Sequence, residues 1–165
     1  MSKTSNQSAT PRVGRRDFLK TSSVVAGAAL ASNLSIARSA HAQGSDVLRV
    51  GLIGCGGRGT GAAVNAMNAD KNAKIVALAD VFQDHLDASL ANLKQNNAAQ
   101  VEVAKERCFV GFDAYKQLID SGVDVVILGE VPHFRPMHLK AAIAAGKHVF
   151  CEKPVAVDAP GVRSV

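Results

Sequence analysis

The chain has 165 residues, of which 47% are hydrophobic and 20% charged, with three cysteines and no tryptophan. This length suits one domain of ordinary size, and the composition is that of a globular chain rather than a disordered or collagen-like one. The cysteines, Cys55, Cys108 and Cys151, form no CxxC pair, which argues against a disulfide framework and against a zinc site. No metal is expected.

The net charge of +5 belongs to the N-terminal segment. Residues 1–42 carry six of the 19 basic side chains but one of the 14 acidic ones, whereas residues 43–165 carry 13 of each. Because the body of the chain is balanced, no basic patch is predicted there. Nucleic acid is therefore not an expected partner.

Residues 1–42 are predicted to be a targeting segment. The string GRRDFLK at 14–20 precedes a weakly apolar run at 24–37, and Ala40-His41-Ala42 has the small-x-small form of a signal peptidase site. The run is shorter than the ~20 residues of a membrane-spanning helix, so stable membrane insertion is not expected. The block resembles a twin-arginine (Tat) signal, which implies the Tat export machinery as a partner and a periplasmic or otherwise exported protein. The alternative is an amphipathic basic helix on a cytosolic protein.

Residues 43–165 alternate between strand and helix patterns and are predicted to be one dinucleotide-binding domain. Apolar, β-branched runs predict strands at 47–53, 74–79, 107–110, 123–128 and 148–151. Helical spacing and end signals predict helices at 57–69, 84–97, 113–119 and 136–145. This alternation predicts right-handed crossovers and the α/β class, with a doubly wound parallel sheet.

A glycine-rich loop lies between the first predicted strand and the first predicted helix, which is the context that gives a GxGxxG string its meaning. Gly54 permits a tight turn, Gly56 lets the backbone approach a pyrophosphate, and Gly59 lets helix and strand pack closely. Free amides at the helix start would face the phosphates. The candidate cofactor contacts in this loop are Gly54, Gly56, Gly57, Arg58 and Gly59, although Arg58 is equally consistent with a solvated side chain.

Asp80 ends the second predicted strand. A carboxylate at this place accepts hydrogen bonds from the adenosine ribose hydroxyls and repels a 2′-phosphate, so NAD is the expected cofactor and NADP the less favoured one. The alternative is that the glycines serve packing alone and Asp80 is an ordinary loop carboxylate.

Glu152 and Lys153 follow the last predicted strand, and ligands of open α/β sheets bind outside the carboxyl ends of the strands. Near an oxidised nicotinamide the Lys153 ammonium would meet a like charge and lose proton affinity, which would suit it to acid/base chemistry. From chemistry alone, a solvated Lys153–Glu152 pair is an equally good interpretation.

The chain resembles the glucose–fructose oxidoreductase/inositol dehydrogenase/rhizopine-catabolism (Gfo/Idh/MocA) family. The strings that carry the resemblance are the loop at 54–59, Ala79-Asp80, GVDVV at 122–126 and, above all, AGKHVFCEKP at 145–154. The resemblance implies that Lys153 is catalytic and lies at the nicotinamide and substrate, with Glu152 beside it.

The resemblance also implies that the segment 129–133 passes along the cofactor. Pro132 and His133 are therefore candidate cofactor contacts, whereas Glu130 and Val131 stand where relatives often have a small residue, Thr or Pro. His138 and His148 are expected to make structural hydrogen bonds, and Cys55 is expected to be a small residue that fits the loop.

The resemblance implies an NAD(P)-dependent oxidoreductase that transfers hydride between nicotinamide and a sugar, polyol or related compound. Two alternatives stay open: an NAD-dependent glycoside hydrolase of the same family, and a non-catalytic nucleotide-binding protein or fragment. Family members carry a further domain that binds substrate, supplies a catalytic histidine and acid, and often forms a homo-oligomer. The chain is expected to stop before that domain, and thus to bind nucleotide without turnover by itself.

Overall fold

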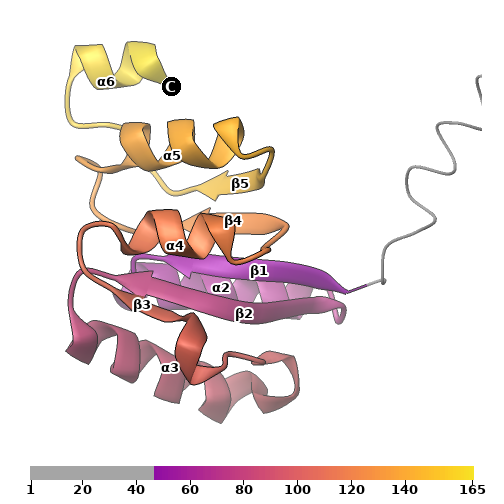
Figure 1. Cartoon of the computed structure of the whole chain (residues 1–165). Helices are drawn as coiled ribbons and strands as arrows, with labels where there is room; N and C mark the ends of the chain where they lie inside the picture. The colour runs from indigo at the N-terminus through magenta and orange to yellow at the C-terminus, as the bar shows by residue number, and fades with distance from the viewer. Residues whose placement is uncertain (1–46) are drawn as a thin grey trace, which may run out of the picture. The chain divides into compact units, whose positions relative to one another are not determined.

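The computed structural model describes residues 47–165, which form five parallel strands joined by helices (Figure 1). The predicted twin-arginine signal lies outside these residues. The strands are β1 (Leu48–Ile53), β2 (Ala73–Asp80), β3 (Cys108–Val110), β4 (Val125–Leu128) and β5 (His148–Cys151). The helices are α2 (Gly57–Ala69), α3 (Gln83–Asn97), α4 (Ala114–Asp120), α5 (Arg135–Ala144) and α6 (Ala159–Ser164), with short 3-10 turns at Ala98–Gln100 and Lys105–Arg107.

The strand order is β3-β2-β1-β4-β5, with every neighbouring pair parallel. The chain runs from β1 outward to β3 and then returns to the other side of β1 for β4. Such a reversal leaves a crevice outside the carboxyl ends of β1 and β4. The structure confirms the predicted doubly wound α/β sheet.

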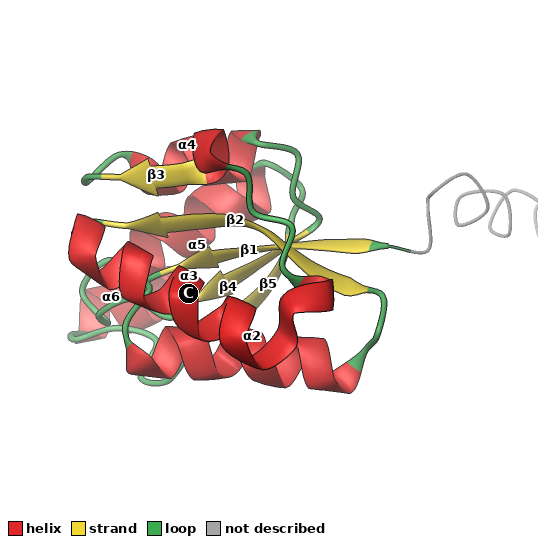
Figure 2. Ribbon diagram, turned by 90° about the horizontal axis from the view of Figure 1, so that it is seen from below, coloured by secondary structure: helices red, strands yellow, loops and turns green. Residues whose placement is uncertain are grey.

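Helices cover both faces of the sheet (Figure 2). On one face, α2 and α3 contribute Met67, Leu86 and Leu93 to a core with strand side chains such as Leu52 and Ile75. On the other face, α4 and α5 pack on side chains that include Val126 and Leu128. The two cores hold the sheet rigid, so its carboxyl edge is a fixed platform.

An ion pair secures the amino edge of the sheet. Asp124, just before β4, binds Arg49 of β1 through Arg49 Nη2 (2.8 Å), Nε (3.0 Å) and the backbone N–H (2.9 Å). The hydrogen bond from the Arg49 guanidinium holds the pKa of the Asp124 carboxyl below its usual value. This contact lies at the edge opposite the crevice.

Several predicted element boundaries differ from the structure by one or two residues, and one predicted cap lacks its side-chain hydrogen bond. β4 begins at Val125 rather than at 123, because Gly122 has a left-handed backbone (φ 85°) and Asp124 turns to Arg49. β3 begins at Cys108 because the preceding residues form a 3-10 turn. Asp113 precedes α4 without a side-chain capping bond, and its carboxylate pairs instead with Lys116 at 2.7 Å.

Within residues 47–165, no helix has both the length and the apolar character needed to span a bilayer.

Candidate cofactor site

The glycine loop is held by contacts that only glycine allows. Gly54 has φ 89°, and a Cβ there would lie 2.2 Å from the backbone nitrogen of Glu130. A Cβ on Gly59 would lie 1.9 Å from the carbonyl oxygen of Gly54, and one on Gly129 would lie 2.5 Å from Gly59 Cα. Loop, helix α2 and the end of β4 therefore meet backbone to backbone. The predictions of a tight turn at Gly54 and close packing at Gly59 are confirmed; Gly129 was not predicted to be part of this contact.

Gly56 and Gly57 differ from these three glycines because nothing lies within 4 Å of a Cβ built on either one. Helix α2 begins at Gly57 without a side-chain cap, and the Thr60 N–H donates to the Gly56 carbonyl at 2.9 Å. The amides that precede Thr60 in this turn point out of the helix start, where the positive end of the helix dipole favours an anion. Open space beside these amides fits a pyrophosphate.

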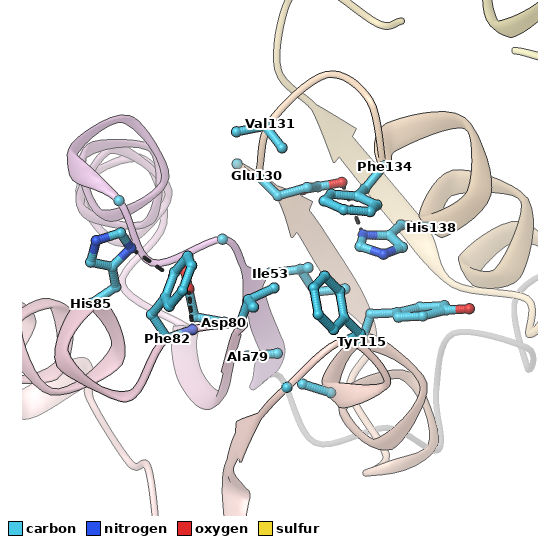
Figure 3. A pocket seen from close by; sticks show the side chains of 17 residues that line it. Ile53, Ala79, Asp80, Phe82, His85, Tyr115, Glu130, Val131, Phe134 and His138 are labelled. Carbon is cyan, nitrogen blue, oxygen red and sulfur yellow. Dashed lines mark hydrogen bonds and ion pairs between the residues drawn. The ribbon is translucent and has the colours of Figure 1, made fainter.

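Asp80 is fixed at the end of β2 by the loop itself. Its Oδ2 accepts the Cys55 N–H at 2.6 Å and its Oδ1 accepts the Phe82 N–H at 2.9 Å, while His85 Nδ1 lies 3.7 Å from Oδ1 (Figure 3). The carboxylate thus orders the glycine loop and also lines the adjoining cavity. The two interpretations of Asp80, loop carboxylate and ribose acceptor, are compatible.

Cys55, within this loop, is buried, with its thiol directed at the Ala79 carbonyl. Burial, reinforced by the charge of Asp80, raises the pKa of the thiol to about 12. Cys55 therefore serves as a small packing residue, as the sequence indicates.

A cavity of about 330 Å³ opens beside Asp80 at the carboxyl ends of the strands. Its wall is mostly apolar and includes Phe112. Phe82 and Phe134 also line it (Figure 3). None of these three phenylalanines was predicted to belong to the site. An apolar cavity with a carboxylate at one side suits a flat aromatic base joined to a ribose. The size and lining fit the adenosine half of a dinucleotide.

The segment after β4 contributes Glu130 and Val131 to this cavity, whereas Pro132 and His133 are absent from its lining. His133 is exposed and packs edge-on against the Phe134 ring, with 5.2 Å between centroids. A cofactor contact at Pro132 or His133 stays a prediction.

His138 of α5 also lines the cavity and is buried between aromatic rings. It stacks on Tyr115 with 4.1 Å between centroids, and its Nδ1 lies 3.1 Å from Oε1 of Glu130. Oε2 of Glu130 is buried without a hydrogen-bond partner. The structural hydrogen bond predicted for His138 is present.

Glu152 and Lys153 follow β5 at the same edge of the sheet. Glu152 is nearly fully buried; its Oε1 pairs with the Arg58 guanidinium and its Oε2 accepts the Lys153 backbone N–H at 3.2 Å. The Arg58 hydrogen bond lowers the pKa of the Glu152 carboxyl. Lys153 is exposed, and the peptide bond to Pro154 is cis. Glu152 is thus paired with Arg58 of the glycine loop rather than with the Lys153 amine.

These features together identify the class of protein domain. A parallel sheet in the order β3-β2-β1-β4-β5, a glycine loop at its crevice and a carboxylate at the end of β2 form a Rossmann dinucleotide-binding domain. The model of the Gfo/Idh/MocA oxidoreductase family, described as an NAD-binding Rossmann fold, matches residues 48–165. The chain belongs to this family.

Similar proteins include inositol 2-dehydrogenases. That of Cereibacter sphaeroides is 32% identical over 118 residues, covering 72% of this chain and 31% of the relative. That of Agrobacterium fabrum is 34% identical over 119 residues, with 72% and 32% covered. The chain therefore spans less than a third of the length of these relatives.

Solved structures agree in fold. An NAD-binding oxidoreductase from Klebsiella pneumoniae has a TM-score of 0.57 at 32% identity, covering 72% of this chain and 30% of that one. A scyllo-inositol dehydrogenase from Lactobacillus casei, solved with NAD(H) and scyllo-inositol, has a TM-score of 0.56 at 25% identity, with 71% and 31% covered. The relatives named here are oxidoreductases, and none is a glycoside hydrolase. Within residues 47–165, no cluster of His, Cys, Asp and Glu could hold a metal ion.

Proposed function

We propose that residues 47–165 form the cofactor-binding part of an NAD-dependent oxidoreductase that acts on a polyol or sugar hydroxyl. One observation carries the proposal: the open space at Gly56 and Gly57, the fixed carboxylate of Asp80 and the Glu152–Lys153 segment all lie at the carboxyl edge of one sheet. A dinucleotide is a ligand long enough to contact all three features along such an edge.

Each part of the edge has its own task. The amides of the α2 start hold the pyrophosphate, and the Asp80 carboxylate accepts the ribose hydroxyls and disfavours a 2′-phosphate by like-charge repulsion. NAD, when bound, supplies the hydride acceptor or donor. Lys153 Nζ, exposed at the far end of the edge, exchanges a proton with the reacting hydroxyl of the substrate.

The substrate class is inferred from the relatives. The inositol 2-dehydrogenases are named for a polyol, and the Lactobacillus casei structure holds scyllo-inositol together with NAD(H). We extend this class to the present chain and expect turnover to need the additional length that these relatives have. Self-association would likewise involve that additional length.

The test uses the protein encoded by the complete open reading frame that contains these 165 residues. Purified protein is mixed with NAD and a panel of inositols and sugars, and cofactor reduction is followed by absorbance. Lys153→Ala should abolish turnover and leave NAD affinity unchanged, whereas Lys71→Ala, at the amino edge before β2, should change neither. Unchanged turnover in Lys153→Ala would refute its role, and NAD binding without reduction by any compound would favour a non-catalytic nucleotide-binding protein.

We further propose that the protein is exported by the twin-arginine route. The support is the GRRDFLK string and the Ala40-His41-Ala42 site. Because that route carries folded proteins, NAD would enter the domain in the cytoplasm and leave with it.

A further inference from the structure

Arg135, the first residue of α5, is a buried charge that makes no direct ion pair within residues 47–165. The residue is 4% exposed. Nη2 donates to the Glu130 carbonyl at 2.6 Å and Nη1 to the Pro154 carbonyl at 2.5 Å, while Nε is buried without a partner. Within the described residues, the hydrogen bonds of the guanidinium therefore go only to two backbone segments.

Such an arrangement is a poor way to gain stability. Removing a guanidinium from water is unfavourable, and two neutral carbonyls compensate less well than a directly paired carboxylate would. The unpartnered Nε adds a further penalty. What Arg135 supplies is geometry, because its planar fork fixes the two carbonyls relative to each other.

The two bridged segments follow adjacent strands at the cofactor edge. The Glu130 carbonyl lies after β4, on a residue that lines the cavity, and Pro154 directly follows Lys153 after β5. In Figure 1, α5 lies beside β5, which brings the start of the helix within reach of both segments. Arg135 thus links the wall of the cavity to the backbone that carries Lys153.

Few other contacts hold that backbone. β5 ends at Cys151, and within the described part of the chain no hydrogen bond between backbone groups involves residues 153–157. On the N-terminal side the Lys153 N–H is held by Glu152 Oε2; on the C-terminal side the Pro154 carbonyl is held by Arg135. The lysine side chain is long and flexible, so the position of its amine depends on how firmly its Cα is held.

We propose that Arg135 is a positioning residue for Lys153. By fixing the Pro154 carbonyl against the cavity wall, it places the Lys153 amine at the nicotinamide end of the bound cofactor. This inference rests on the proposed function, since it needs Lys153 beside the nicotinamide. A loss of about 1 Å in placement is enough to impair a catalytic group.

The experiment measures how well NADH shields the Lys153 amine from acetylation. The 165-residue chain is treated briefly with an acetylating reagent, alone, with NADH and with ADP-ribose, and each lysine is quantified by peptide mass spectrometry. The reduced cofactor is used because its nicotinamide carries no positive charge that would make the Lys153 amine more reactive. In the unmodified chain NADH should slow acetylation of Lys153 severalfold by covering the amine, and ADP-ribose, which lacks nicotinamide, should not. Arg135→Met should lose this protection while its affinity for NADH, measured by calorimetry, stays within about threefold.

Lys140→Met is the matched control, because it removes an exposed positive charge from the same helix. It should keep full protection. Arg135→Lys, which keeps the charge but not the planar fork, should keep only part of it. That graded result separates positioning from a general effect of charge.

Each other outcome overturns the inference. Equal protection in Arg135→Met and the unmodified chain would exclude a positioning role and leave the proposed function standing. NADH binding to the unmodified chain without protection of Lys153 would refute both, since Lys153 would not lie at the nicotinamide. Loss of folding or of NADH binding in both Arg135 variants would make Arg135 a structural residue instead.

Discussion

Gly59→Ala should destabilise the domain, because the new methyl group has no room. Its Cβ would lie 1.9 Å from the Gly54 carbonyl oxygen, and real Cβ contacts are essentially never below 3.0 Å, so α2 and the loop must separate by about 1 Å. Overpacking of this kind costs about 1–3 kcal/mol of unfolding free energy. The same shift moves the α2 amides away from the pyrophosphate and should weaken NAD binding by about tenfold or more.

Gly61→Ala is the matched control, because Gly61 lies in the same helix and nothing is within 4 Å of its Cβ position. Here alanine should stabilise the domain by about 0.5–1 kcal/mol through its better helix propensity. Urea unfolding followed by circular dichroism measures both variants, and calorimetry measures NAD affinity. Equal stability of the two variants would refute the packing argument for the glycine loop.

Three further predictions follow from other parts of the chain. Gly56→Ala places its methyl group in open space, so unfolding free energy should change by less than about 0.5 kcal/mol while NAD affinity falls about tenfold; unchanged affinity would remove the pyrophosphate from this position. Because the pKa of Asp124 is lowered, its pairing with Arg49 stabilises the fold above about pH 4, and this stabilisation is lost as pH falls through the folded-state pKa. In Asp124→Asn the free energy of unfolding should therefore fall less with acid, by at most about 1 kcal/mol, as urea unfolding across pH would show. Replacing Arg15 and Arg16 together by lysine should retain the protein in the cytoplasm, whereas Lys3→Ala should leave export, measured by cell fractionation, intact.

The fold was predictable from the sequence because its signals are local. The GxGxxG loop and Asp80 lie within the first β-α-β stretch, and each strand or helix pattern follows from its own residues. The boundary of β4 was not predictable, because residue 124 turns to an arginine on another strand.

The features of the site that were not predictable from the sequence depend on contacts between distant residues. Glu152 pairs with Arg58, 94 positions away, and no sequence pattern distinguishes that partner from the neighbouring Lys153. Gly129 is required only because Gly59 lies against it. In the sequence, nothing distinguishes Arg135 from an ordinary residue at the start of a helix. Its burial depends on the folded position of β5 and Pro154 beside it.

Titration of the 165-residue chain and of Asp80→Asn with NAD and NADP, by calorimetry, tests the central claim most directly. The unmodified chain should bind NAD at least about tenfold more tightly than NADP, because the Asp80 carboxylate favours ribose hydroxyls over a phosphate; Asp80→Asn should bring the two affinities closer. Binding of neither dinucleotide, or tighter binding of NADP by the unmodified chain, would contradict the account.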